Sequence, residues 1–191
     1  MLKDLLSKNR SYRRFDENIR IEQDVLINLI DLVRLAPSSV NMQPLRFSLV
    51  NDPEINARVF DTLGWAGLLK DWKGPDEGER PSAYIVILCD NTIAKNMKTD
   101  VGISAQTIML GAVENGFGGC MLGSVDRGKL AEILNIDTQR YSIELVLALG
   151  KPAETVRIVD IPENGSTAYY RDKNGIHYVP KRSVDELIIN N

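Results

Sequence analysis

The sequence predicts a mixed fold of α+β or α/β class, and three observations support this. Apolar residues recur at helical spacing over residues 22–36 and 99–115. Two short apolar runs, residues 84–89 and 143–149, have the length and composition of buried strands. Turn-forming residues separate these segments, so roughly four or five strands occur among as many helices.

The first part of the chain is predicted to contain two helices and a strand between them. The apolar stripe of residues 22–36 is too wide for a surface helix, so we expect this helix to be mostly buried. Pro37 ends it, because proline cannot continue a helix. Residues 45–50 follow as a short strand, and residues 54–63 as a second helix.

Residues 64–81 are predicted to form an irregular lid or binding loop. They contain four glycines, two prolines and both tryptophans of the chain. Trp65 and Trp72 could stack on an aromatic substrate, and anchoring of the loop to the core is an equally open interpretation.

The second half is predicted to contain a long helix over residues 99–115, with Gly116 as its C-terminal cap. Small residues such as Gly111 would let another element approach it closely. The tail is predicted to form a hairpin around Lys173-Asn174-Gly175, with His177 as a surface cross-strand residue. The other predicted elements are strands at residues 84–89 and 143–149 and helices at residues 127–135 and 181–189.

Composition excludes several classes of protein. The formal net charge of −3 argues against a broad basic face for nucleic acid. No apolar run approaches the roughly 20 residues of a membrane span, and the charged N-terminus does not resemble a signal peptide. His177 is the single histidine, which disfavours histidine-based zinc sites and catalytic triads. Cys89 and Cys120 lie in apolar runs, which predicts buried thiols in a cytoplasmic protein.

Three polar or glycine-rich segments are candidates for a binding site. Arg10–Arg14 offers three guanidiniums that could surround a phosphate, although a solvated loop would look the same. Ala36–Pro44 offers uncharged hydroxyls and amides that could pair with a heterocycle, although an ordinary helix end and turn would suffice. Gly116–Gly123 could let a backbone approach a flat ligand, or simply connect a helix to a strand.

The order and spacing of these segments resemble the nitroreductase family of FMN-dependent oxidoreductases. Arg10–Phe15 is similar to the family's Arg-Ser-x-Arg-x-Phe motif, and Ala36–Pro44 to its Ala-Pro-Ser-Ser-x-Asn-x-Gln-Pro block. Gly116–Gly123 is similar to its Gly-Leu-Gly-x-Cys-x-x-Gly motif, with Phe117 in place of leucine. Leu149–Glu154 completes the resemblance, which covers roughly the first 155 residues.

The resemblance implies an α+β fold of α/β/α type, with a central, mostly antiparallel sheet flanked by helices. It implies one FMN-binding domain over residues 1–191, with a lid-like insertion at about 64–81 and a C-terminal hairpin or extension at about 155–191. Similar proteins are intertwined homodimers that bind FMN at the subunit interface. No catalytic side chain and no metal are implied, because the flavin carries the chemistry.

The resemblance also implies which residues contact FMN. Arg10, Ser11 and Arg13 would hold the phosphate, with Lys181 or Arg182 as further candidates. The other subunit would contribute Pro37, Ser38, Ser39 and Asn41, and the backbone of Met121, Leu122 and Gly123 would lie along the ring. Many relatives have a second basic residue where this chain has Asn9, so one phosphate contact is weakened.

The function implied is transfer of a hydride from NAD(P)H, through flavin N5, to a small acceptor such as a nitroaromatic compound or a quinone. Three alternatives stay open: dehalogenase-type or flavin-modifying chemistry, a sensory or storage flavoprotein without turnover, and an interaction module without a ligand. The sequence contains no dinucleotide motif that would distinguish NADH from NADPH.

Overall fold

The computed structural model describes residues 2–69 and 71–190, which divide into two units. The main unit comprises the chain up to Trp65 together with Gly74–Ala153. The small unit comprises Ala66–Lys73 together with the chain from Glu154 onward. The described residues between 64 and 81 form no helix or strand, as predicted, and they contribute to both units.

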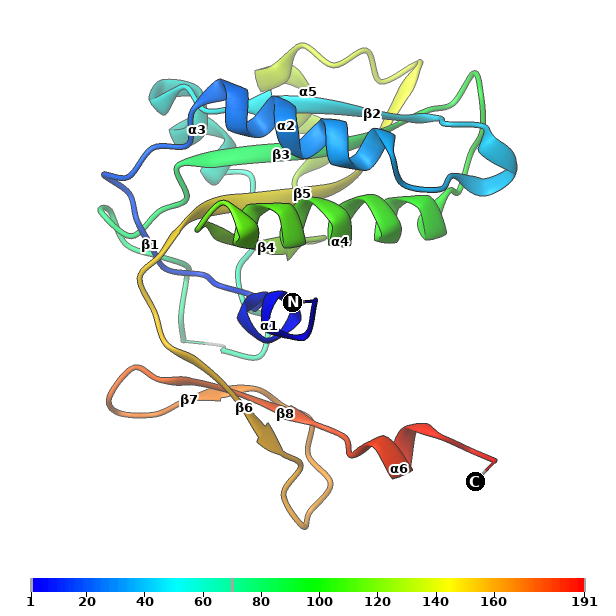
Figure 1. Cartoon of the computed structure of the whole chain (residues 1–191). Helices are drawn as coiled ribbons and strands as arrows, with labels where there is room; N and C mark the ends of the chain where they lie inside the picture. Colours follow the sequence, from blue (N-terminus) through cyan, green and yellow to red (C-terminus); the bar gives the residue numbers. More distant parts are fainter. Residues whose placement is uncertain (1, 70, 191) are drawn as a thin grey trace. The chain divides into compact units, whose positions relative to one another are not determined.

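A five-stranded sheet lies at the centre of the main unit (Figure 1). Its strands are β1 (Phe15–Asp16), β2 (Leu45–Val50), β3 (Ala83–Asp90), β4 (Gly118–Leu122) and β5 (Tyr141–Pro152). The long strand β5 pairs with β1, β3 and β4, and β2 pairs with β3 at the sheet edge. Every one of these pairings is antiparallel, which confirms the predicted α+β fold.

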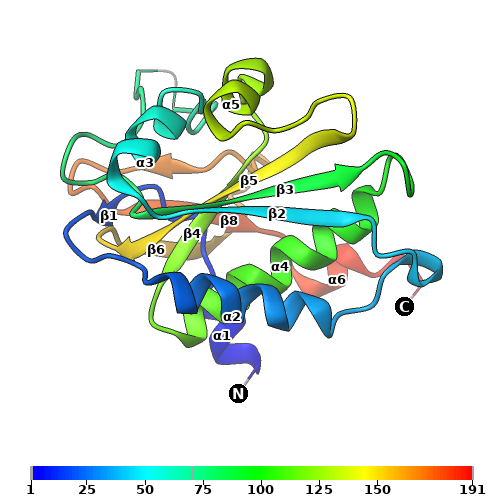
Figure 2. The ribbon, with the colours of Figure 1, turned by 90° about the horizontal axis from the view of Figure 1, so that it is seen from above.

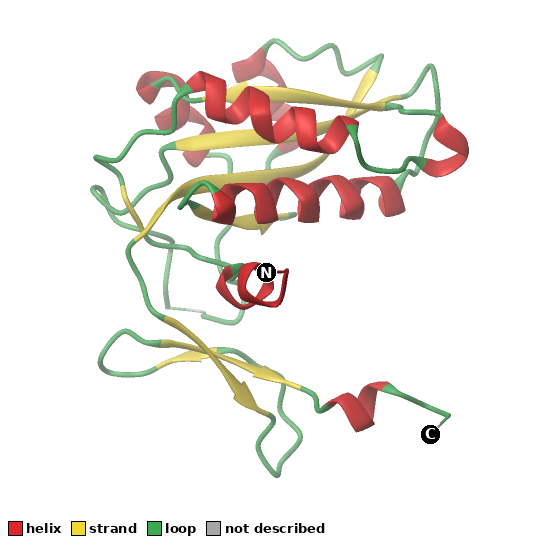
Figure 3. Ribbon diagram, in the orientation of Figure 1, coloured by secondary structure: helices red, strands yellow, loops and turns green. Residues whose placement is uncertain are grey.

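Helices cover both faces of this sheet (Figures 2 and 3). The helices of the main unit are α1 (Leu2–Lys8), α2 (Gln23–Arg34), α3 (Pro53–Phe60), α4 (Lys98–Glu114) and α5 (Arg127–Leu134). Helices α2 and α4 lie on one face, and α3 and α5 lie on the other. None of the helices described is long and apolar enough to cross a membrane.

The core lies between the sheet and the pair α2 and α4. Ile85 and Ile87 of β3 and Leu147 of β5 are fully buried there, as the apolar runs predict. Gly111 lets α2 approach α4, because a Cβ at this position would lie 2.6 Å from Leu32 Cδ1. Gly116 caps α4 with a φ of +79°, and Phe117 N donates to Ala112 O at 2.8 Å, which is the backbone pattern of a Schellman cap.

Helix α2 differs from its prediction, because it is only partly buried. Leu26 and Leu29 are buried, whereas Ile27 is 50% exposed and Leu32 is 36% exposed. The apolar stripe is wider than the surface that α4 and the sheet cover, so its far side is uncovered in the single chain.

The small unit contains a three-stranded sheet of β6 (Val156–Asp160), β7 (Tyr170–Arg171) and β8 (His177–Lys181), followed by α6 (Val184–Leu187). Strands β7 and β8 form the predicted antiparallel hairpin, whose turn contains Gly175 at a φ of +79°. Strand β6 was not predicted, and it pairs in parallel with β8.

The prediction that His177 is a surface residue is wrong, because its side chain is only 1% exposed. Strand β6 follows Thr155, whose carbonyl accepts from His177 N at 2.9 Å, and the Tyr169 ring lies 5.2 Å from the imidazole. A salt bridge from Arg171 to Glu154, at 2.9 Å, adds to this interior. Val156, Ile158 and Val159 are β-branched and favour a strand, but no local pattern shows that this strand pairs with β8 beside the hairpin.

Candidate functional site

The first predicted binding segment, Arg10–Arg14, lies beside the glycine-rich strand β4. Ser11 forms a parallel bridge with Gly119, and Tyr12 N donates to Gly119 O at 2.9 Å. Gly118 makes this approach possible, because a Cβ there would lie 2.6 Å from Tyr12 Cδ2. The fold therefore brings together two predicted segments that are about a hundred residues apart in the sequence.

The three arginines of this segment have different surroundings. Arg14 Nε pairs with Glu79 Oε2 at 3.1 Å, so its charge is compensated within the protein. Arg10 Nη2 donates to Leu6 O at 2.6 Å, and Arg13 Nη1 donates to Ser11 O at 3.4 Å. Arg10 Nε is buried and has no hydrogen-bond partner among the described residues. A guanidinium held in this way fits an oxyanion such as phosphate.

Strand β4 ends in an open stretch of backbone. Met121 is 39% exposed, Leu122 is buried, and Gly123 follows the strand. A Cβ built on Gly123 would meet no described atom within 4 Å. The end of β4 therefore presents a backbone surface that a flat ring could approach.

The second predicted segment, which contains Ser38 and Ser39, is held by Asp100 of α4. Ser38 Oγ donates to Asp100 Oδ2 at 2.5 Å, and Ser39 Oγ donates to Asp100 Oδ1 at 2.5 Å. Ser39 N also donates to the same carboxylate, at 3.1 Å from Oδ2. Asp100 is 3% exposed, and burial alone would raise the pKa of its carboxyl group. The hydrogen bonds from Ser38 and Ser39 outweigh burial and lower this pKa below its ordinary value.

This segment has a strained backbone. Val40, Asn41 and Gln43 have φ values of 51°, 54° and 49°, a left-handed conformation that is rare for residues other than glycine. Val40 is β-branched and 92% exposed, so its own packing does not hold it there. Gln43 N donates to Ser38 Oγ at 3.0 Å, and Gln43 Nε2 donates to Asn41 O at 3.2 Å. Gln43 therefore braces the segment, and strain of this kind is typical of ligand-binding loops.

The two polar segments lie near opposite ends of α4 (Figure 1). Asp100 is in the first turn of this helix, and the strand that contains Gly119 begins four residues after the last helical residue, Glu114. A helix of 17 residues is about 25 Å long. In one chain, Ser38 and Ser39 are therefore far from Ser11 and its arginines.

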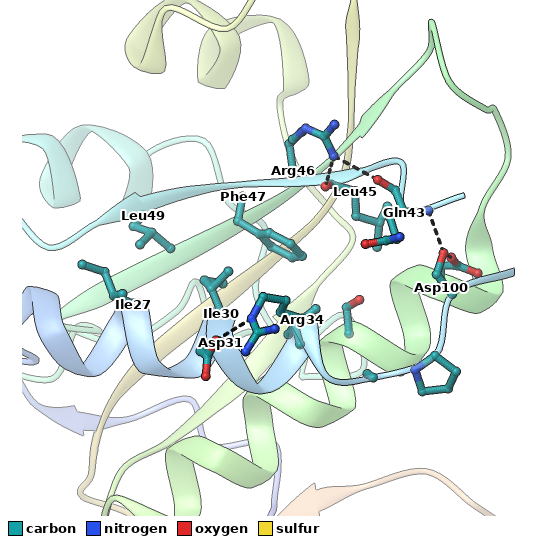
Figure 4. A pocket seen from close by; sticks show the side chains of 15 residues that line it. Ile27, Ile30, Asp31, Arg34, Gln43, Leu45, Arg46, Phe47, Leu49 and Asp100 are labelled. Atoms are coloured by element: carbon teal, nitrogen blue, oxygen red, sulfur yellow. Dashed lines mark hydrogen bonds and ion pairs between the residues drawn. The ribbon is translucent and has the colours of Figure 1, made fainter. Parts of the chain in front are cut away.

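An apolar groove of about 530 Å³ lies between α2 and the edge strand β2 (Figure 4). Ile27, Ile30 and Phe47 line it, and so do Pro37 and Ser38 of the segment that follows α2. The groove includes the uncovered side of α2, so it extends the apolar surface next to the strained segment.

The remaining predicted residues lie elsewhere in the chain. Trp65 belongs to the main unit, where it is 8% exposed and its ring lies 5.6 Å from that of Phe60. Trp72 belongs to the small unit, under the guanidinium of Arg171 at 4.7 Å. Lys181 and Arg182 also belong to the small unit, where Arg182 pairs with Glu186 at 3.3 Å.

Asp100 is the site residue that sequence reasoning missed. The sequence feature that points to Asp100 is its position four residues before Ser104, which puts a carboxylate on the same buried face of a predicted helix. A buried carboxylate needs hydrogen-bond donors, and the adjacent serines of residues 38 and 39 supply them.

Comparisons with known proteins identify the family of this chain. The model of the nitroreductase family matches residues 6–81 and 81–151, which is more than half of the chain. YdgI of Bacillus subtilis, named as an NAD(P)H nitroreductase, is 23% identical over 184 residues, covering 79% of this chain and 88% of that protein. Iodotyrosine deiodinase of Thermotoga neapolitana is 24% identical over 169 residues, covering 80% of this chain and 89% of that protein.

A solved structure has the same fold. A nitroreductase of Exiguobacterium sibiricum in complex with FMN superposes with a TM-score of 0.69 and is 21% identical. The match covers 86% of this chain and 94% of that chain. With the family match over most of the main unit, these findings show that the chain belongs to the nitroreductase family.

Proposed function

We propose that this protein is an FMN-dependent oxidoreductase that uses NAD(P)H to reduce a small electron acceptor, such as a nitroaromatic compound or a quinone. The observation that carries this proposal is the pairing of the Arg10–Arg14 segment with the glycine-rich strand β4. When bound, FMN supplies hydride chemistry through its N5 atom. The residues of the chain then bind, orient and shield the reacting groups.

Arg10, Ser11 and Arg13 would hold the phosphate of FMN. The buried Arg10 Nε, which has no partner in the described chain, fits this role because a phosphate oxygen would complete its hydrogen bonding. Met121, Leu122 and Gly123 would lie along the flavin ring, and the open space beside Gly123 fits a flat group. The assignments of Lys181 and Arg182 to the phosphate, and of Trp65 and Trp72 to the acceptor, stay predictions.

A second subunit would complete each site. Pro37, Ser38, Ser39 and Asn41 lie near the far end of α4 from Arg10, so we propose that they reach the FMN of the partner in a homodimer. The uncovered apolar side of α2 supports this proposal, because a partner would remove it from water. Cys89 and Cys120 are both buried, which suits the reducing cytoplasm in which we propose that the protein acts.

If both subunits build the site, FMN content and dimer content should fall together on dilution. Sedimentation velocity with detection at the flavin absorption band measures both quantities in one experiment. The flavin signal should follow the dimer boundary at every concentration. A monomer that retains its full complement of FMN would contradict the shared site.

The first test of the activity is the absorption spectrum of the purified protein. We expect flavin bands that bleach on anaerobic addition of NADH or NADPH and return when a nitroaromatic compound or a quinone is added. Flavin bands that neither nicotinamide bleaches would favour a sensory or storage role. A colourless protein that takes up no added FMN would overturn the proposal.

One alternative has support from the comparisons. A relative named as a deiodinase is as similar to this chain as the relative named as a nitroreductase. Dehalogenase-type chemistry at the same FMN site is therefore the second candidate. Iodotyrosine added to the reduced protein distinguishes the two, because only a dehalogenase would release iodide.

A further inference from the structure

A second cavity, of about 290 Å³, lies in the main unit between α3, the start of β3 and the residues after β1. We call it the α3 cavity. Helix α3 lies on the face of the sheet opposite to α2 and α4 (Figure 2), so this cavity is separate from the groove beside α2. None of the residues proposed to bind FMN lines it.

Four residues that line this cavity each have a buried polar atom without a hydrogen-bond partner among the described residues. The atoms are Asn56 Oδ1, Arg80 Nε, Ser82 Oγ and Tyr84 Oη. Asn56 is 8% exposed, Ser82 is 6% exposed and Tyr84 is fully buried. Buried polar atoms in native proteins almost always have a partner, so four around one cavity indicate that something else binds there.

The orientation of the Asn56 amide is fixed. Asn56 Nδ2 donates to Ser82 O at 2.7 Å, so the oxygen Oδ1 is the end that lacks a partner. An amide oxygen only accepts hydrogen bonds. A ligand that satisfies it must therefore carry a donor such as a hydroxyl group.

The other three atoms favour an anion. Arg80 supplies a positive charge, and its guanidinium lies over the Phe60 ring, 4.3 Å from the ring centre, which helps to hold it in place. Arg20 adds a second positive charge, and among the described residues Glu17 is the one carboxylate that lines the cavity. Glu17 Oε2 already accepts from Gly78 N at 2.6 Å. Burial raises the pKa of Tyr84, so its phenol stays protonated and can donate, as the hydroxyl of Ser82 can.

We propose that the α3 cavity binds a small organic anion that carries a hydroxyl group, such as a short hydroxy acid. Arg80, Ser82 and Tyr84 donate to its carboxylate, and its hydroxyl donates to Asn56 Oδ1. The size of the cavity, near the lower limit for ligand pockets, suits a molecule of this kind.

Matched pairs of acids test this proposal. Isothermal titration of the FMN-loaded protein compares L-malate with succinate and L-lactate with propionate, which differ by one hydroxyl group. We expect the hydroxy acid to bind at least about tenfold more tightly in at least one pair, because the other acid leaves Asn56 Oδ1 without a donor. Absence of saturable binding by both hydroxy acids would mean that the cavity holds ordered water only, which overturns the proposal.

The variant Tyr84→Phe distinguishes a binding site from a packing defect. We expect it to weaken hydroxy-acid binding at least about tenfold, because one donor to the carboxylate is lost. Its melting temperature without ligand should be equal to or above that of the native protein, because a buried hydroxyl without a partner is removed. Tyr170→Phe is the matched control, since Tyr170 is 50% exposed and distant in sequence, and should change neither quantity.

A second variant, Ser82→Ala, keeps the test decisive if Tyr84→Phe does not fold. It removes another of the four atoms and should also weaken binding of the hydroxy acid. Unchanged affinity in the folded variant of either residue would overturn the assignment.

Discussion

Alanine at both Arg10 and Arg13 is expected to weaken FMN binding by more than tenfold. Each charge-assisted hydrogen bond to phosphate contributes about 1.5–3 kcal/mol, and the double variant removes two cationic donors. The Kd is measured by titrating the apoprotein with FMN and following the quenching of flavin fluorescence. The loss should be larger at low salt, because ions screen the attraction between guanidinium and phosphate.

The control removes two positive charges elsewhere in the main unit. Arg58 and Lys129 are exposed residues of α3 and α5, so Arg58→Ala with Lys129→Ala changes the net charge equally. This control should bind FMN as the native protein does. Because Arg13 is only 9% exposed, the single variant Arg10→Ala separates loss of a phosphate contact from loss of stability. Equal FMN affinity in the native and double-variant proteins would remove these arginines from the site.

Much of the fold could be predicted because hydrophobic periodicity and turn chemistry act locally. The spacing of apolar residues located α4, and the prediction that Gly116 caps it is confirmed by its φ of +79°. The glycines of residues 116–123 are compatible with close approach to a flat ligand and with a link from a helix to a strand, and the sequence does not distinguish the two. The structure forms a strand there because Gly119 leaves room for Ala148 O, which a Cβ at this position would contact too closely. That close approach depends on a strand distant in sequence, which no local pattern reports.

The same limit explains the errors in burial. The apolar stripe of α2 indicates that the helix has a wide nonpolar face. The stripe does not show that α4 covers only part of this face, so that Ile27 stays half exposed. The error at His177 has the opposite sign, because this residue is more buried than predicted. It lies in the predicted hairpin, and the unpredicted strand β6 helps to bury it. The sequence motifs predict most of the candidate site. They do not predict Asp100, because its role depends on the fold, which brings its carboxylate within hydrogen-bonding distance of Ser38 and Ser39.

Replacement of Asp100 by alanine is expected to lower the free energy of unfolding by about 3 kcal/mol or more. A hydrogen bond to a charged group contributes about 1.5–3 kcal/mol, and this carboxylate accepts from both serine hydroxyls and from a backbone N–H. Urea unfolding followed by circular dichroism measures the change. Asp24→Ala is the control, because Asp24 is an exposed carboxylate of α2, and it should cost less than about 1 kcal/mol.

The pH dependence gives a separate test of the same carboxylate. The pKa of Asp100 is lowered in the folded protein, so its contribution is fully present above the unfolded-state pKa of about 3.9. The contribution is lost as the pH falls through the lower, folded-state pKa. The stability difference between the native protein and Asp100→Asn should therefore be constant from about pH 5 to 8 and should narrow below about pH 4. Asp90, whose pKa is also lowered, titrates in both proteins, so it largely cancels from the difference.

The consequence for FMN binding follows from the strained backbone that Asp100 holds. Left-handed conformations at Val40, Asn41 and Gln43 cost of order 1–3 kcal/mol each, and they persist only while surrounding contacts impose them. Without the carboxylate, the segment should relax, and the proposed contacts of Ser38, Ser39 and Asn41 with the partner's FMN should be lost. The Asp100→Ala variant should therefore lose FMN at temperatures where it is still folded. If the folded variant kept native FMN affinity, this segment would have a structural role alone.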